Sequence, residues 1–495
     1  MSEDRHEDRA PAVATGITDL RPFYLAALAC LLLLCALTCV GQVRRRCEAG
    51  SFAGQSLERV YVGTFLLCAA ADWLQGPFVY ALYDSYGYSG FALASLFVTG
   101  FASAMLLGPM VGQFADRFGR KRSILLLYCG AYSAACVTKH FNVYGVLLLG
   151  RVLCGVATSV LYSSFESWLV CEHARRQLPT EALDAIFSSM YFGNGLCAIV
   201  MGVVAQLLAD AMPMREMGGG PVHVGGYLGP FDLAILFLVA GGAAMAHTWR
   251  ENADETAGAL AARDCGSRVG HALAVLREDR LLQLLMAVSS AVESAMYAFI
   301  FEWTPALSHA GRTPPHGLVF ACFMLCYMMG SNAFSWLRGR NVEPADALPA
   351  VTGVAAAALA VAWLLHLGRI VHYDGGTVGC FLAFLLFEAT IGLYMPVLAA
   401  IKARHVPEDV RATMYTLFRV PLNLIVVAIL LATLSLNYTL MLCTLLLLVA
   451  LGCSIPLRTM LQQRAEAERD RGPPSASSTT TGGVAGTEST GLLKK

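Results

Sequence analysis

Charge is scarce in this chain, and so are the motifs that hold a metal or build a catalytic nucleophile. Only 14% of its 495 residues are charged, whereas 56% are hydrophobic and the mean hydropathy is +0.58. Soluble domains carry about 25% charged residues, so the composition excludes a soluble globular protein and predicts a multi-pass membrane protein. The net charge is zero, which gives no reason to expect a nucleic-acid partner.

Cysteine is present, but not in a pattern that binds metal. The sixteen cysteines include no Cys-x-x-Cys pair, and they are scattered through apolar runs, where free cysteine packs as a small hydrophobe. The sequence also lacks a His, Glu and Cys cluster with metal-ligand spacing and lacks a nucleophile motif. We therefore expect that the protein is not an enzyme and that it holds no metal and no cofactor.

Apolar runs of about the length that crosses a bilayer recur thirteen times. The runs are 23–41, 60–83, 91–115, 123–138, 143–170, 185–209, 231–247, 281–307, 317–337, 348–367, 378–402, 412–434 and 438–457. They predict an all-α polytopic membrane protein. The polar tails at 1–22 and 461–495 are predicted to be disordered.

A charged segment at residues 112–121, Gly-Gln-Phe-Ala-Asp-Arg-Phe-Gly-Arg-Lys, separates two of these runs, and we call it the signature segment. Its pattern is Gly-x-x-x-Asp-x-x-Gly-Arg-Lys, carried by Gly112, Asp116, Gly119, Arg120 and Lys121. The pattern resembles the loop between the second and third helices of major facilitator superfamily transporters. The resemblance implies the major facilitator fold, with two six-helix bundles at 57–247 and 281–460 joined by a cytoplasmic linker at 248–280. It makes the first run, 23–41, an extra transmembrane helix before the core. In this fold Asp116 and the basic residues would latch one state at the cytoplasmic face.

Basic residues are concentrated in the loops on the side of the signature segment, which predicts that this side faces the cytosol. We assign Lys402 and Arg404 to these cytoplasmic loops. The first helix is long and ends in Arg44-Arg45-Arg46. These features favour an uncleaved anchor over a signal peptide and place residue 1 outside.

Ionisable side chains within the predicted helices are the strongest functional signal, because a charge at membrane depth is costly without a partner or a wet cavity. We expect Arg151 and Arg419 to bind substrate, since a guanidinium keeps its charge and its planar fork suits an oxyanion. Further predicted substrate-binding residues are Ser159, Tyr162, Asn194 and Asn423. The competing interpretation is that the charges form structural ion pairs between helices.

Four carboxylic acids also lie at membrane depth, and we assign them to proton coupling or gating. They are Asp72, Glu166, Glu293 and Glu388. Burial favours the neutral form of a carboxyl group. Counted as ionised, the four outnumber the two arginines, which predicts that at least one is protonated or exchanges a proton in the empty site.

Several short stretches narrow the resemblance within the superfamily. They are Ala-Ala-Asp72-Trp73-Leu-Gln75-Gly-Pro77, Gly150-Arg151, Phe165-Glu166-Ser-Trp168, Glu293-Ser294, Trp303-Thr-Pro305, Gly392-Leu-Tyr394-x-Pro396 and Phe418-Arg419-Val-Pro421-Leu. Together they resemble the molybdate-anion transporter family, also described as the major facilitator superfamily domain-containing protein 5 group. The resemblance, over about residues 70–457, implies uptake of molybdate by alternating access, by a monomer in the plasma membrane or an internal membrane.

Three alternatives remain open from the sequence. Sulfate has nearly the shape and charge of molybdate, so the residues do not separate the two. Another small anion or an organic solute such as a sugar is the main rival substrate. A non-transporting sensor is supported by an eroded second copy of the signature segment, in which Phe334 stands where an aspartate would follow Gly330; the charges within the helices argue against it.

Overall fold

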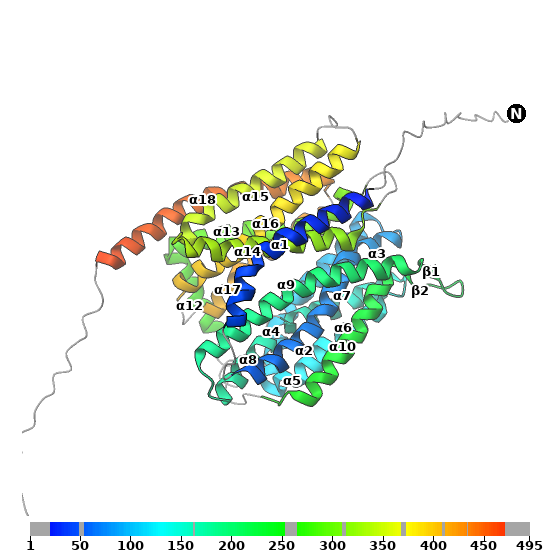
Figure 1. The fold of residues 1–495 in the computed structure, drawn as a ribbon, viewed down its shortest axis with the longest axis horizontal. Helices are drawn as coiled ribbons and strands as arrows, with labels where there is room; N and C mark the ends of the chain where they lie inside the picture. Colours follow the sequence, from blue (N-terminus) through cyan, green and yellow to red (C-terminus); the bar gives the residue numbers. More distant parts are fainter. Residues whose placement is uncertain are drawn as a thin grey trace, which may run out of the picture.

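The computed structural model describes residues 20–48, 54–161, 164–252, 265–308, 313–367, 373–407, 411–432 and 434–470. Within these ranges the fold is helical apart from one two-stranded hairpin (Figure 1). The described residues contain eleven helices long and apolar enough to cross a membrane. The continuous helical run at 120–138 and the shorter α17 supply the remaining two spans of the predicted thirteen. The predicted all-α, multi-pass architecture is therefore confirmed.

The N-terminal half contains six core helices, several of them built from consecutive pieces. In order they are α2 (Gln55–Gln75) with η1 (Gly76–Phe78) and α3 (Val79–Ser85), α4 (Gly90–Phe118), α5 (Arg120–Ser123) with η2 (Ile124–Gly130) and α6 (Ala131–Thr138), α7 (Tyr144–Leu161) with α8 (Ser164–Arg175), α9 (Thr180–Ala211), and α10 (Gly229–Thr248). The antiparallel pair β1 (Arg215–Glu216) and β2 (His223–Val224), followed by η3 (Gly226–Leu228), connects α9 to α10.

The C-terminal half repeats the plan with fewer breaks. Its helices are α12 (Cys265–Glu278), α13 (Arg280–Leu307), α14 (His316–Gly339), α15 (Pro344–Leu367), α16 (Tyr373–His405), α17 (Arg411–Leu431) and α18 (Leu436–Asp470). Each half has its own hydrophobic core, and α1 (Arg21–Glu48) packs onto the core of the C-terminal half through Tyr24 and Leu28.

The first core helix contains a short irregular turn. Gly76 and Pro77 open the 3₁₀ turn η1 between α2 and α3. Proline has no backbone N–H and cannot donate to the α-helical hydrogen-bond ladder, so the regular α-helix is interrupted here.

Most of the predicted loop at 112–121 is helical. α4 continues to Phe118, and the chain turns only at Gly119, whose φ is +103°. No residue between Gly112 and Phe118 is a helix breaker, whereas a positive φ of this kind suits glycine alone. The signature segment is thus the end of one helix, a single glycine and the start of the next.

Two segments predicted to be irregular are helical. The predicted linker contains α12, whose Ala272 and Leu276 are buried. The last helix runs on to Asp470, ten residues past the predicted start of the tail. Its extension is held by Leu461, which is buried, and by an ion pair of 2.9 Å between Arg464 and Asp279. The tail residues beyond 470 lie outside the described ranges.

Two of the contacts described between the halves lie toward one end of the helices. We call the end that carries the signature segment the signature end, and the end that carries β1 and β2 the far end (Figure 1). Near the far end, the backbones of Gly202 on α9 and Gly317 on α14 leave no room for a Cβ atom, and Gln206 accepts a hydrogen bond of 2.8 Å from the Gly317 N–H. A third hydrophobic cluster contains buried residues of both halves, among them Leu93 of α4 and Leu422 of α17.

The extra helix α1 lies along α14 (Figure 1). Asn332 on α14 donates hydrogen bonds to Thr38 (3.4 Å) and Cys39 (3.2 Å) of α1. At the start of α1, Arg21 pairs with Asp210 of α9 at 3.4 Å. The helix therefore belongs to the C-terminal half but also contacts the N-terminal half at the far end.

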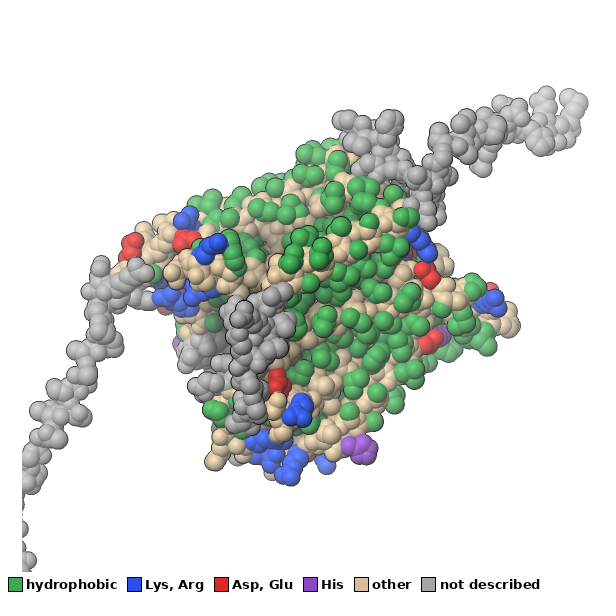
Figure 2. Space-filling model, viewed as in Figure 1, with side chains coloured by type: hydrophobic (Ala, Val, Ile, Leu, Met, Phe, Trp, Pro, Cys, Tyr) green, Lys and Arg blue, Asp and Glu red, His purple; other side chains and the backbone are tan. Residues whose placement is uncertain are grey.

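Figure 2 shows a broad hydrophobic surface between two charged ends, as a bilayer requires. In this view most Lys and Arg side chains lie at the signature end. This distribution agrees with the predicted cytoplasmic orientation of that end.

Candidate functional site

Four aromatic residues form a seam between α4 and α13, in the region where the halves meet. Phe97 lies edge-on to Phe301 with ring centroids 5.2 Å apart, and one turn further Phe101 lies edge-on to Tyr297 at 5.3 Å. Tyr80 of α3 also contacts Phe301, at 5.2 Å. We call Phe97, Phe101, Tyr297 and Phe301 the aromatic seam.

Arg151 lies on the N-terminal side of the seam. Its Nε donates a hydrogen bond of 3.1 Å to the Leu96 carbonyl of α4, and its guanidinium carbon is 5.0 Å from the centre of the Phe97 ring. The side chain is 8% exposed, and a Cβ atom on Gly100 would come within 2.6 Å of the guanidinium. Arg151 is thus clamped against the backbone of α4 in this conformation.

Arg151, Gly155 and Ser159 recur every four residues, a spacing that predicts one face of α7. Gly155 packs against the α4 backbone, and the Ser159 hydroxyl donates a hydrogen bond of 3.2 Å to the Ala104 carbonyl. Tyr162 lies outside the described residues. The four-residue spacing therefore aligns Arg151, Gly155 and Ser159 as predicted, and all three contact α4.

Arg419 lies on the opposite side of the seam, on α17, and its side chain is exposed. Its guanidinium lies beside the Tyr297 hydroxyl. Because the Tyr297 ring touches Phe101 of the other half, Arg419 stands at the boundary between halves. Asn423, one turn further along α17, is half-buried. Arg151 and Arg419 thus flank the seam and do not touch in this conformation.

Glu293 is part of a polar cluster in the C-terminal half. The Lys402 ammonium on α16 lies 3.5 Å from the Glu293 carboxylate, and their side chains are 16% and 17% exposed. The Ser289 hydroxyl donates to Glu293 at 2.7 Å and accepts from Lys402 at 2.8 Å. Lys402 was assigned above to a cytoplasmic loop. α16 instead continues to His405, so Lys402 lies in the last turn of that helix, with its ammonium turned toward Glu293 of α13.

The remaining three carboxyls are apart from this cluster. Asp72 accepts a hydrogen bond of 2.5 Å from Tyr132 of α6, and Glu166 accepts one of 3.0 Å from Tyr191 of α9. Glu388 is 7% exposed, and the titratable groups near it are Tyr327 and Cys326 of α14. Each carboxyl therefore sits at a different helix contact.

Asn194 ties the first and fifth core helices together. Its carbonyl oxygen accepts a hydrogen bond of 2.9 Å from the Trp73 indole. The Trp73 ring in turn lies 5.9 Å from Phe320 of α14. Asn194 therefore lies beside a contact between the halves, although its oxygen is already engaged.

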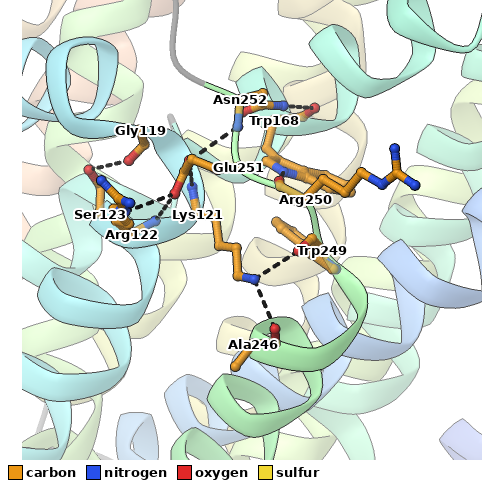
Figure 3. A network of polar contacts seen from close by, with 10 residues as sticks. All are labelled: Gly119, Lys121, Arg122, Ser123, Trp168, Ala246, Trp249, Arg250, Glu251 and Asn252. Atoms are coloured by element: carbon orange, nitrogen blue, oxygen red, sulfur yellow. Dashed lines mark hydrogen bonds and ion pairs between the residues drawn. The ribbon is translucent and has the colours of Figure 1, made fainter.

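The signature segment contacts Glu251, which follows the end of α10 (Figure 3). The Glu251 carboxylate accepts hydrogen bonds of 3.0 Å from the backbone N–H groups of both Lys121 and Arg122. A carboxylate at this position caps the first turn of a helix and matches its dipole. The Lys121 ammonium donates to the carbonyls of Ala246 and Trp249, each at 2.8 Å, and so caps the end of α10.

Two tryptophans hold the chain that carries Glu251. Trp168 and Trp249 stack with centroids 3.7 Å apart, and the Trp168 indole donates to the Arg250 carbonyl at 2.8 Å (Figure 3). Arg120 donates to the Cys171 sulfur of α8 at 2.7 Å. Gly112 and Asp116 belong to the last turns of α4, and the Asp116 side chain lies outside what the structure describes.

Comparison with known proteins of similar sequence shows to which family this chain belongs. A family model described as sugar transporters with 12 transmembrane segments matches residues 23–387. A molybdate-anion transporter of Takifugu rubripes is 33% identical over 75% of this chain and 78% of its own length, and one of Xenopus tropicalis is 32% identical over 84% and 89%. The chain belongs to the molybdate-anion transporter family of the major facilitator superfamily.

A solved structure supports the same fold. A bacterial homologue of the iron transporter ferroportin, in an inward-facing state, superposes with a TM-score of 0.63 at 13% identity, covering 82% of this chain and 99% of that one. The chain is accordingly a multi-pass membrane transporter and not an enzyme.

Proposed function

We propose that this transporter carries molybdate into the cytosol across the plasma membrane. The observation that carries the proposal is the identity of about a third, over most of the chain, with proteins named molybdate-anion transporters. Molybdate is a compact dianion that needs fixed positive charge and hydroxyl or amide donors. Arg419, Lys402 and Tyr297 supply such groups within one neighbourhood of the C-terminal half.

Alternating access is the mechanism that suits this arrangement. The contacts between the halves that we identify among the described residues, from Gly202–Gly317 to the aromatic seam, lie toward the far end. A rocking-bundle transporter closed at one end presents its site to the other. In this conformation the site therefore faces the signature end, and rocking about the seam would bring Arg151 and Arg419 to a common substrate.

The test is uptake of labelled molybdate by cells that make the wild type or Arg419→Ala. We expect saturable uptake by the wild type and a loss of about tenfold or more in the variant, because a charge-assisted hydrogen bond is removed. Absence of wild-type uptake above background would end the molybdate proposal. Unchanged uptake in the variant would remove Arg419 from the site.

Competition separates the rival substrates in the same assay. Unlabelled sulfate that suppresses uptake as strongly as molybdate does would mean that the site recognises tetrahedral dianions in general. The family description names sugars, so glucose is the second competitor, and we expect no effect from it. A sensor would show no flux with any of the three solutes.

A further inference from the structure

The Lys402–Glu293 pair is built like an exchangeable site. Two opposite charges lie 3.5 Å apart at membrane depth, each nearly buried, and Ser289 bonds to both. Removing an ion pair from water costs more than its attraction commonly returns, and charged side chains inside membrane helices mark substrate or ion pathways. Its contribution to stability therefore does not explain why this ion pair lies inside the helices.

The surroundings of Lys402 favour an anion. Its ammonium lies 5.3 Å from the centre of the Phe418 ring, next to Arg419 in sequence. Arg419 and Lys402 are close enough to repel one another, and Glu293 is the carboxylate that offsets them. Two cations share one carboxylate here, so the cluster carries a net positive charge.

Resting on the proposed function, we infer that Lys402 is a substrate-binding residue and that Glu293 is its exchangeable counter-ion. The incoming dianion takes the place of the Glu293 carboxylate on Lys402 and is held on its other side by Arg419. Ser289, which already donates to a carboxylate oxygen, donates to the oxyanion instead. No covalent bond forms or breaks.

Charge balance then assigns a proton to Glu293. In this conformation Arg151 is held against α4 and does not belong to the cluster. Lys402 and Arg419 with ionised Glu293 leave one positive charge, and a bound dianion turns this into one negative charge. One proton taken from water by the released Glu293 carboxylate makes the loaded cluster neutral, which is the form that crosses an apolar barrier at least cost. The inference therefore selects Glu293 among the four candidate carboxyls as the one that couples a proton to the anion.

The groups that face Glu293 are consistent with this role. They are Lys402 and Tyr394 from α16 and Ser289 and Tyr297 from its own helix α13, and Arg419 of α17 lies near both Lys402 and Tyr297. The α18 side chains near α13, Thr439 and Cys443, lie around Glu302 instead. Lys402 and Arg419 are thus the cations that Glu293 balances.

The experiment compares Lys402→Met, Glu293→Gln and the double variant with the wild type. Purified proteins are heated with and without sodium molybdate, and uptake is measured against molybdate concentration. We expect Lys402→Met to raise the KM about tenfold or more, as loss of a charge-assisted contact does. Arg340→Ala, which removes an exposed cation stacked on Trp336, is the control and should behave as wild type.

The double variant separates binding from folding. If Lys402 only neutralises Glu293, then Glu293→Gln should restore both stability and molybdate affinity to Lys402→Met. Our inference expects it to restore stability alone. Glu293→Gln by itself should bind molybdate more tightly and lose the dependence of uptake on external pH. A double variant with wild-type KM and thermal response would overturn the inference, whereas a wild type without any molybdate response would overturn the proposed function itself.

Discussion

The carboxylate of Glu251 fills the space beside the α-carbon of Gly119 that a side chain there would need. Gly119 has a φ of +103° and separates α4 from α5. Its missing side chain lets Glu251 reach the first N–H groups of α5 (Figure 3). Two physical requirements therefore favour glycine at the second glycine position of the pattern in the signature segment, Gly119. The backbone there has a positive φ, and the Glu251 carboxylate occupies the space of a side chain.

Replacing this glycine should loosen the signature end. Gly119→Ala should lower the stability of the purified protein by about 1–2 kcal/mol from backbone strain, with a further loss as Glu251 is displaced. Glu251→Ala should cost about 1 kcal/mol, the usual value of a helix cap. Because both variants remove the same contact, the double variant should melt higher than the sum of the two effects predicts. Strict additivity in thermal melts would show that the two positions are independent.

The position of the Arg151 side chain depends on another glycine, Gly100. Because the guanidinium lies where a Cβ atom on Gly100 would project, Gly100→Ala should push it off the Leu96 carbonyl. We expect molybdate uptake to fall in Gly100→Ala as it does in Arg151→Ala, with a stability loss of about 1–3 kcal/mol from overpacking. Gly90→Ala at the start of the same helix is the control, since nothing lies within 4 Å of its Cβ position. Normal uptake in Gly100→Ala would mean that Arg151 has no role in its present position.

The sequence predicts the helices well because their signal is local. Apolar length gives each span, and Pro77 marks the break in the first core helix. The errors lie where the local signal is weak. No glycine or proline lies between residues 113 and 118 of α4 or between residues 458 and 470 of α18, and burial against neighbouring helices orders α12 within a polar linker.

The site is harder to predict, because periodicity assigns a residue to a face of its own helix but not to a partner. The spacing places Glu293 on one face of α13, yet its pairing with Lys402 depends on how α13 packs on α16. Lys402 was missed because it stands at the end of an apolar run, next to Arg404. The absence of a helix breaker between Lys402 and Pro407 is the signal that would have kept it within the helix. With Lys402 included, the four carboxyls exceed the cations by one charge, not two.

A histidine near the far end should make stability depend on pH. The His140 ring nitrogens face the Asp232 carboxylate at 2.9 Å and the His223 carbonyl at 3.0 Å, and only the protonated ring donates to both. The Asp232 hydrogen bond raises the pKa of His140, although burial opposes it. The stabilisation is therefore complete below the unfolded pKa of about 6.5 and disappears as the pH rises through the higher folded pKa.

His140→Ala should accordingly lower the melting temperature most in acidic buffer. The difference in melting temperature from wild type should shrink as the pH is raised toward about 9, where the ring is neutral in both the folded and the unfolded protein. Asp232→Asn, which removes the acceptor charge, should show the same trend. A melting-temperature difference that stays constant between about pH 5.5 and pH 9 would contradict the assignment.

The glycine contact at the far end should control transport more than folding. Gly317 lies against the α9 backbone, so Gly317→Ala forces the halves apart where they must close. Gly330 on the same helix lies against the Ala389 carbonyl within the C-terminal half, so Gly330→Ala should chiefly lower the melting temperature. Gly339→Ala meets nothing within 4 Å and is the neutral control. We expect Gly317→Ala to lose molybdate uptake while its melting temperature falls less than that of Gly330→Ala. The reverse order would show that the α9–α14 crossing is a fixed structural joint, and alternating access would then have to open elsewhere.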